Sequence, residues 1–441
     1  MTRALLLIVA AAVMVGSSAA AQPPGAQPPV SSSRYVDPAG GMSLADAITL
    51  AVRQEPSIRG ARMQIDVAAG RRRQAALRAN PTATIERKKE PGGTDNQTTF
   101  GAQLPLELFR RGARVAAAER EIDVVRFEVA DRERLLAADV RARYGAALVA
   151  IRELTVLEEL VGAVGRQLEL LTARAQEGAA PPLERDLLDV EVRRLKTDQR
   201  LQAARVDTAL VELRRILGLV PEAALALRET LDALVTHESG AAPPPTTDDV
   251  VRERPDVRAA EARIHAADAT IRQSVSDGRV DVTLFGSYMR MDAGFMQQGF
   301  APDGSLQRVR GVFNYVTGGA MVTLPLLNRN QGAIAAARAE HSAAEAARDA
   351  ALLQSRTEAA AARIDDASAR EAVAQYRDAI RPMARKNLDV VSETFALGRA
   401  TVFDVLNEQR RYLDIERAYT DALRSAFEAR TRLQLAAGDI R

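Results

Sequence analysis

The stretch that follows Gly398 contains the side chains best placed to do chemistry. It reads Arg-Ala-Thr-Val-Phe-Asp-Val-Leu-Asn and so carries Arg399, Asp404 and Asn407. Carboxylates gathered at one place raise one another's pKa and attract cations. If symmetry between copies of the chain sets several copies of Asp404 close together, the chemistry expected here is the attraction of cations. The plainer alternative is that Asp404 is an acidic residue at a helix N-terminus, where the macrodipole favours it.

A second acidic pair lies in the first half of the chain. Asp186 and Asp189 follow Gly178 much as Asp404 follows Gly398, and the spacing predicts two extra residues in the first turn. Both glycines suit the left-handed residue that ends a helix. We therefore expect two helix-connecting turns that differ in length and in acidic pattern.

Soft and nitrogen ligands are present but not arranged as a metal site. Met289, Met291 and Met296 lie near Asp292, and thioethers favour Cu(I). Methionines that face lipid or lie in a loop are the plainer interpretation. Three histidines are scattered without metal-ligand spacing: His237, His265 and His341. We predict no metal site and no cofactor.

Composition excludes several classes of function. The sequence has no P-loop, no Gly-x-Gly-x-x-Gly and no Ser/His/Asp arrangement, so we predict that it is not an enzyme. Its 60 basic and 58 acidic residues leave a net charge of +2, which predicts no nucleic-acid partner. The absence of cysteine excludes disulfides, thiolate sites and a lipidated N-terminal Cys.

The N-terminus predicts export. Residues 1–21 read as a cleaved signal peptide, with Arg3, an apolar core at residues 4–15 and small residues before the cleavage point. Residues 22–42 form a lead-in rich in Pro and Ser. No later stretch reaches about 18 consecutive apolar residues, so no transmembrane helix is predicted.

The rest of the chain repeats itself. Pro105 lies in a Leu-Pro-Leu and is followed by Gly112, and Pro325 and Gly332 repeat this pattern 220 residues later. Such self-similarity predicts two copies of one structural unit. We place the first unit at residues 43–220, a joining segment at 221–247 and the second unit at 248–438.

Each unit is expected to contain a short helix, two strands, a long helix, a turn and a returning helix. In the first unit we place helices at residues 44–79, 112–177 and 183–217, with a break at Glu55-Pro56, and strands at 82–89 and 97–106. In the second unit we place helices at 248–277, 333–396 and 402–436, and strands at 280–291 and 312–324. The second strand hairpin is predicted to be about 20 residues longer than the first.

The long helices require an unusual context. A helix over residues 112–177 is roughly 100 Å long. Small and apolar residues from Ala147 to Ala175 recur in a 3-4 rhythm that predicts a coiled-coil seam. Four strands in one chain leave open edges, which closure into a barrel would remove. We therefore expect the chain to need copies of itself.

This layout resembles the TolC-type outer-membrane efflux factors over residues 42–438. The stretch at residues 324–334, Leu-Pro-Leu-Leu-Asn-Arg-Asn-Gln-Gly-Ala-Ile, resembles their heavy-metal (cobalt–zinc–cadmium type) branch. The resemblance implies a mainly α fold with a small β part and a homotrimer in the outer membrane of a Gram-negative bacterium. Each chain would give four strands to a twelve-stranded barrel and its helices to a long periplasmic tunnel. Pro105 and Pro325 would mark the strand-to-helix junctions.

The resemblance also implies roles for the turns. Asp404 matches the first acidic position of the family's periplasmic constriction, and Asn407 replaces the second. Arg399, Asp186 and Asp189 would lie at the same constriction. The turns themselves would meet a periplasmic adaptor through four residues: Gly178, Ala179, Leu397 and Gly398.

The function implied is a passive exit duct of a tripartite efflux system. An adaptor and an inner-membrane pump of the resistance–nodulation–division type would load it, and outer-membrane lipid would surround it. The branch resemblance favours heavy-metal cations as cargo, with small toxic compounds second. Two alternatives stay open: the outer-membrane duct of a type I protein-secretion system, and a periplasmic coiled-coil protein with no pore.

Overall fold

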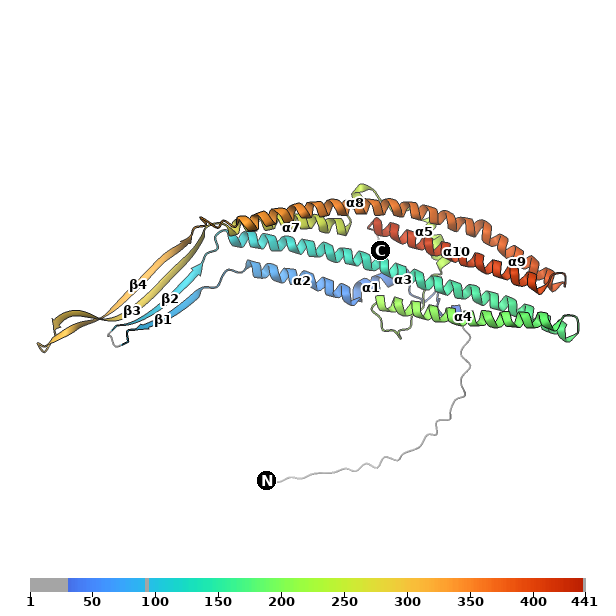
Figure 1. Cartoon of the computed structure of the whole chain (residues 1–441), viewed down its shortest axis with the longest axis horizontal. Helices are drawn as coiled ribbons and strands as arrows, with labels where there is room; N and C mark the ends of the chain where they lie inside the picture. Colours follow the sequence, from blue (N-terminus) through green and yellow to red (C-terminus); the bar gives the residue numbers. More distant parts are fainter. Residues whose placement is uncertain (1–30, 92–94, 439–441) are drawn as a thin grey trace, which may run out of the picture.

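The chain forms a long rod of helices with a four-stranded sheet at one end (Figure 1). The computed structural model describes residues 31–91 and 95–438. The signal peptide predicted at residues 1–21 lies outside the described residues, and so does the lead-in up to residue 30. No helix in the described part of the chain combines the length and the apolar character that crossing a bilayer requires.

The first half of the chain follows the predicted order closely. Its elements are α1 (Leu44–Gln54), α2 (Pro56–Ala76), β1 (Thr82–Lys89), β2 (Asn96–Pro105), α3 (Arg110–Gln176) and α4 (Pro182–Ile216). Ser43 and Asp46 form a capping box at the start of α1, which satisfies backbone donors that the helix leaves free. The predicted break at Glu55 is confirmed, because Pro56 can begin a new helix but cannot continue the old one.

The second half repeats the order with longer strands and a divided long helix. Its elements are α6 (Asp248–Arg252), α7 (Pro255–Asp277), β3 (Asp281–Phe300), β4 (Leu306–Thr323), α8 (Gln331–Gln375), the π-helical turn η2 (Tyr376–Ile380), α9 (Arg381–Ala396) and α10 (Val402–Ala436). The segment between the halves contains α5 (Leu231–Gly240), and the short helix η1 (Ser32–Arg34) precedes α1.

Two predictions about the second half were wrong. The extra residues of the second hairpin extend both strands, to Phe300 and from Leu306, instead of forming a long loop. Backbone pairing carries the strands through residues such as Gly294, whose type gives little strand signal, with a register shift between Gly294 and Gln298. The long helix expected at residues 333–396 is interrupted by η2 just before Pro382, which has no N–H to donate within an α-helix.

The sheet joins the two halves of the chain. Its strands are all antiparallel in the order β1-β2-β3-β4, and the pairing of β2 with β3 links the two strand hairpins. No described strand pairs with the outer edge of β1 or of β4. Thus the sheet of a single chain is open on both sides.

The two largest apolar clusters hold most of the helices together. One lies around the middle of the rod and includes Tyr144, Leu154 and Phe427, and the other lies toward the turns. The predicted seam on α3 is confirmed, since Leu154 and Val164 are fully buried along it. The seam therefore packs α3 against neighbouring helices along most of its length.

Candidate functional site

Both helix-connecting turns lie at the end of the rod opposite the sheet (Figure 1). Gly178 and Gly398 have φ of 75° and 73°, the left-handed conformation expected for a residue that ends a helix. In each turn the next residue donates its N–H back across the helix end, from Ala179 to the carbonyl of Arg174 and from Arg399 to that of Thr394. The two turns therefore share one backbone geometry.

The helices that leave the turns start differently. The side chain of Thr401 accepts a hydrogen bond from the N–H of Asp404, and the Asp404 carboxylate accepts one from the N–H of Thr401 at 2.9 Å. Pro181, at the same place before α4, offers no side-chain cap. The hydrogen bonds from the Thr401 N–H and hydroxyl hold the pKa of Asp404 below its ordinary value. Asp404 is therefore a capping residue in the single chain.

The predicted difference in turn length is wrong. α4 begins at Pro182 and α10 at Val402, each four residues after its glycine. The error came from matching acidic residues instead of glycines. By position in the helix, Asp404 corresponds to Glu184, and Asp186 lies two residues further along α4.

The other predicted polar residues of these turns are exposed, except Asp189, which is half-buried. Asp186 and Asp189 form ion pairs with neighbours on their own helix, at 2.6 Å to Arg185 and 2.9 Å to Arg193. Asn407 and Arg399 are exposed, and their side chains contact no described partner through a hydrogen bond or ion pair. One chain therefore brings these residues to one end of the rod but does not gather them into a closed site.

Direct contacts hold the two turns beside each other. The Arg174 guanidinium of α3 donates to the carbonyls of Phe395, at 3.3 Å, and of Ala396 at the end of α9. A cation placed there satisfies carbonyls that the helix end leaves free. Leu171, Leu188 and Phe395 pack together beneath the turns.

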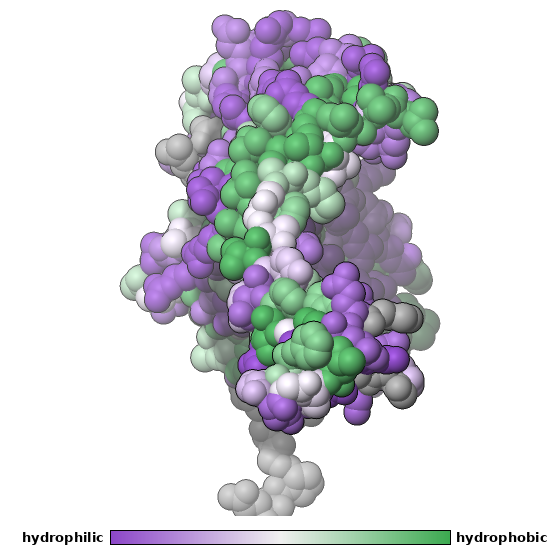
Figure 2. Space-filling view, turned by 90° about the vertical axis from the view of Figure 1, so that its left-hand side faces the viewer, coloured by the Kyte–Doolittle hydropathy of each residue, from purple (hydrophilic) through white to green (hydrophobic). Residues whose placement is uncertain are grey.

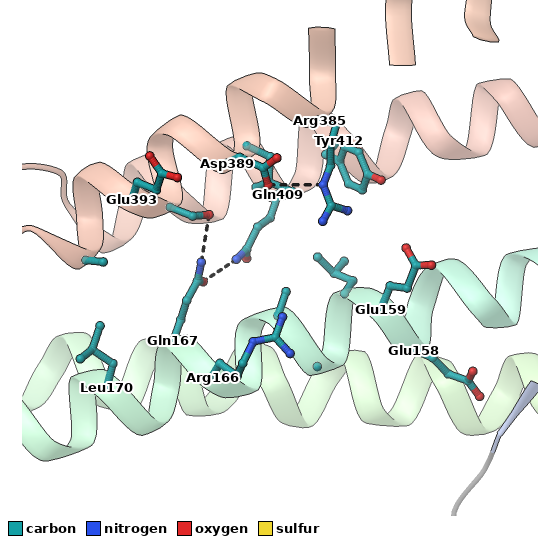
Figure 3. A pocket seen from close by; sticks show the side chains of 16 residues that line it. Glu158, Glu159, Arg166, Gln167, Leu170, Arg385, Asp389, Glu393, Gln409 and Tyr412 are labelled. Carbon is teal, nitrogen blue, oxygen red and sulfur yellow. Dashed lines mark hydrogen bonds and ion pairs between the residues drawn. The ribbon is translucent and has the colours of Figure 1, made fainter. Parts of the chain in front are cut away.

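A groove of about 810 Å³ lies between α3 and α9, further along these helices than the turns. At one end Gln167 bridges the two sides, donating to Ser392 at 3.1 Å and accepting from Gln409 at 2.7 Å (Figure 3). Arg385 and Asp389 on α9 form an ion pair at 3.3 Å across from Glu159. Polar and apolar side chains line both walls of the groove, and the sequence analysis did not identify it.

A buried ion cluster lies next to the π-helical turn, and it was also missed. Glu416 on α10 is 1% exposed and accepts from Arg381 at 2.6 Å and from Arg152 at 3.0 Å. Burial alone would raise the pKa of Glu416, but the hydrogen bonds and charges of the two arginines lower it. The partners are distant in sequence, so no local pattern could have revealed the cluster.

In the half of the sheet nearest the helices, one face is mostly apolar and the other is mostly polar. Strand register places one row of apolar side chains across all four strands: Ile85, Phe100, Tyr288 and Val316. All four are exposed in the single chain. The adjacent row on the other face consists of small and polar residues: Thr84, Gly101, Ser287 and Thr317. Seen from the sheet end, hydrophobic residues gather in a band beside hydrophilic ones (Figure 2).

The methionines and histidines are not gathered at one place. Met289 and Met291 lie on the polar face of β3, and the side chain of Met296 lies outside what the structure describes. His237, His265 and His341 are on α5, α7 and α8. Within residues 31–91 and 95–438, no group of three or more His, Cys, Asp or Glu could hold a metal ion.

The strand-to-helix junctions contain the predicted prolines and glycines. Pro105 is the last residue of β2 and Pro325 follows the end of β4. Gly112 and Gly332 lie in the first turns of α3 and α8, with open space around the position of a Cβ. The unusual backbone is instead at two other residues, Glu107 with φ of 44° and Asn330 with φ of 61°.

Comparisons with known proteins agree on family and fold. A model of the family described as outer membrane efflux protein matches residues 47–219 and 247–439. No curated protein matches the sequence. Among solved structures, one of CusC, whose description concerns transmembrane channel formation, superimposes with a TM-score of 0.73 at 16% identity, covering 90% of this chain and 92% of that one.

Two further solved structures have the same fold. The open state of the MtrE outer membrane channel of Neisseria gonorrhoeae gives a TM-score of 0.70 at 18% identity, over 90% of this chain and 88% of that one. The outer membrane protein VceC of Vibrio cholerae gives 0.69 at 19% identity, over 90% and 96%. At these identities the likeness is one of fold: long helices with a small antiparallel sheet.

Proposed function

Because the chain belongs to the outer membrane efflux protein family, we propose that it is the exit duct of a tripartite efflux system. An inner-membrane pump, of the resistance–nodulation–division type by resemblance, and a periplasmic adaptor would deliver the cargo. The observation that carries the proposal is the two-faced, open-edged sheet at the end of a 67-residue helix. That helix is about 100 Å long, enough to reach far from a membrane.

A homotrimer would complete the sheet. The open edges of β1 and β4 can pair between neighbouring copies, and three copies of four strands would close a twelve-stranded barrel. The apolar row from Ile85 to Val316 would then face lipid, and the polar row would face the lumen. Closure also satisfies every backbone group in the hydrocarbon region, which lipid itself cannot do.

The turns would form the periplasmic constriction and the adaptor contact. Threefold symmetry would bring three copies of Asp404 together, where their charges attract cations. Leu397, beside Gly398, is 72% exposed although it is apolar, which suits a residue covered by an adaptor. The branch resemblance makes heavy-metal cations the first cargo to test and small toxic compounds the second.

Planar-bilayer recording tests the duct and its constriction together. The purified protein should run as a trimer and conduct ions. Replacing Asp404 and Asn407 by Ala should raise single-channel conductance and weaken block by multivalent cations. The matched control is Asp414→Ala with Asp421→Ala, which removes exposed acids from α10 away from the turns. A monomer without conductance contradicts the duct, and an unchanged conductance and cation block contradict the constriction.

Crosslinking tests the adaptor contact. Gly398→Leu places a bulky side chain where φ is 73°, so the turn must change shape. We expect weaker crosslinking to the adaptor and lower resistance of cells to the cargo. Gly240→Leu, at the end of α5 in open space, is the control. Intact crosslinking and resistance in the Gly398 variant would rule out docking at this turn.

A further inference from the structure

The junction between the sheet and the helices has a strong positive charge. It is made of four segments, residues 71–82, 104–114, 276–283 and 321–332, which we call the collar. The collar contains nine arginines and three acidic residues, a net charge of +6 in a chain whose net charge is +2. The rest of the chain is therefore net negative, and the positive charge is concentrated in one place.

Hydrogen bonds fix the four segments against one another. Arg111 donates to the carbonyl of Ala76 at 2.7 Å, and Arg110 donates to that of Asp277 at 3.2 Å. Asn330 donates to the carbonyl of Ser274 at 2.8 Å, next to the third segment. The collar is therefore a single structural feature, located where the sheet meets the helices (Figure 1).

Ion pairs within the collar neutralise only part of its positive charge. Glu107 is held by Arg114 at 2.9 Å, and Asp281 by Arg110 at 3.2 Å. Three other arginines are exposed and have no hydrogen-bond or ion-pair partner among the described residues: Arg71, Arg73 and Arg78. These guanidinium groups are available to an external anion.

Large apolar side chains are exposed among these arginines. Leu327 is 92% exposed and Leu326 is 70% exposed. Four other apolar side chains of the collar are also exposed: Leu77, Leu108, Phe109 and Leu324. Water alone does not favour such a surface. The boundary of a bilayer does, because leucine can enter the acyl region while arginine reaches phosphate oxygens with its planar fork of donors. The apolar face of the sheet adjoins the collar on the side away from the helices.

We infer that the collar binds the phosphate headgroups of anionic phospholipids in the leaflet on the helical side of the membrane. This inference rests on the proposed function, which places the sheet in the bilayer. The leucines fix how deep the chain lies, and the free arginines select negatively charged headgroups. The two contributions can be measured separately.

Tryptophan fluorescence measures the depth, because the natural chain contains no Trp. Single Trp variants are made at Leu327 in the collar, at Val316 on the apolar face and at Leu397 in the distant turn, and are reconstituted with brominated phosphatidylcholines. We expect Val316→Trp and Leu327→Trp to be quenched, the latter most by bromines near the headgroup, and Leu397→Trp to stay unquenched. Quenching of Val316→Trp without Leu327→Trp overturns the collar inference alone. No quenching of either overturns the proposed function as well.

Native mass spectrometry measures headgroup selection. Protein from nanodiscs of phosphatidylglycerol and phosphatidylcholine should retain more phosphatidylglycerol, and replacing Arg71, Arg73 and Arg78 by Gln should reduce that preference roughly tenfold. The control replaces three exposed arginines on α4 and α10 by Gln: Arg193, Arg411 and Arg417. Equal lipid retention by the wild type and the collar variant, or an equal loss in the control, overturns the inference.

Discussion

The two helical hairpins have the same turn but different chemistry. α3 and α4 form a hairpin whose long helix is uninterrupted for 67 residues and whose turn leads into α4 through two prolines. In the second hairpin the long helix is divided by a π-helical turn, and α10 starts with a capping box. The comparison teaches that one turn backbone can carry different side-chain contacts. The second hairpin contains a capping box at Thr401 and an ion pair between Arg381 and buried Glu416.

Buried charge separates the two returning helices most clearly, because α10 buries Glu416 and Arg430 and α4 buries no charged residue. Glu416 on α10 is enclosed by two arginines, whereas Lys196, which lies 220 residues earlier on α4, is exposed. A buried ion pair costs desolvation free energy, so it contributes specificity of position more than net stability. The cluster fixes α10 against α3 and against the helix that follows the π-helical turn.

The largest predicted effect is therefore at Glu416. Glu416→Ala leaves two arginine side chains without their shared partner, and we expect the free energy of unfolding to fall by about 3–5 kcal/mol. Chemical denaturation of the reconstituted protein measures this. Lys196→Ala is the matched change in the first hairpin and should have little effect. Equal losses in the two variants would remove the distinction between the hairpins.

Arg174 tests whether the second turn depends on the first hairpin. Arg174→Met removes a charged donor from the carbonyls of Phe395 and Ala396, which should cost about 1.5–3 kcal/mol. Hydrogen exchange in residues 395–400 should become faster, while exchange in residues 175–180 should change little. Arg166→Met, on the same helix, is the control. Unchanged exchange in the second turn would mean that each hairpin holds its own turn.

The capping box gives a smaller effect. Thr401→Ala should destabilise the start of α10 by about 1 kcal/mol, because it removes the acceptor for the Asp404 N–H. Amide exchange at residues 402–405 reports it. Pro181→Ala removes no cap from α4 and should not reproduce the effect. A similar acceleration at the start of α4 would contradict the difference between the two helix starts.

The same cap predicts a pH dependence. The pKa of Asp404 is lowered in the folded chain. Its contribution to the stability of α10 is therefore fully present above the ordinary carboxyl pKa of 3.8 and is lost as pH falls through the lower pKa of the folded chain. Exchange at the start of α10, corrected for the intrinsic effect of pH, should accelerate only in that acidic range. Asp404→Asn should abolish the transition. Measured on the single chain, where copies of Asp404 are not brought together, a transition near neutral pH would contradict the capping geometry.

The smallest effect comes from building the missing cap. Pro181→Thr places Thr-x-x-Glu at the start of α4, because Glu184 already lies at the third helical position. We expect the new cap to stabilise α4 by only a few tenths of a kcal/mol, because losing the proline raises the conformational entropy of the unfolded chain and offsets part of the gain. Slower exchange at residues 182–186 would show that capping alone distinguishes the helix starts. No change would point to the surrounding contacts instead.

Local patterns predicted much of this fold. Gly178 and Gly398 indicated left-handed helix ends, and the 3-4 rhythm on α3 indicated its buried seam, because each signal lies within a few turns of chain. Glu416 could not be predicted, since its partners are distant in sequence. The long β3–β4 ladder was missed because backbone pairing, which depends on the neighbouring strand, overrides the weak strand preference of its residues.

The open edges of β1 and β4 have a consequence before any duct exists. A single chain presents two free strand edges next to an exposed apolar face, which is the combination that drives edge-to-edge aggregation. The hazard grows with the time for which the edges stay unpaired. In the proposed homotrimer, shielding of this end until the copies meet would therefore raise the yield of folded protein.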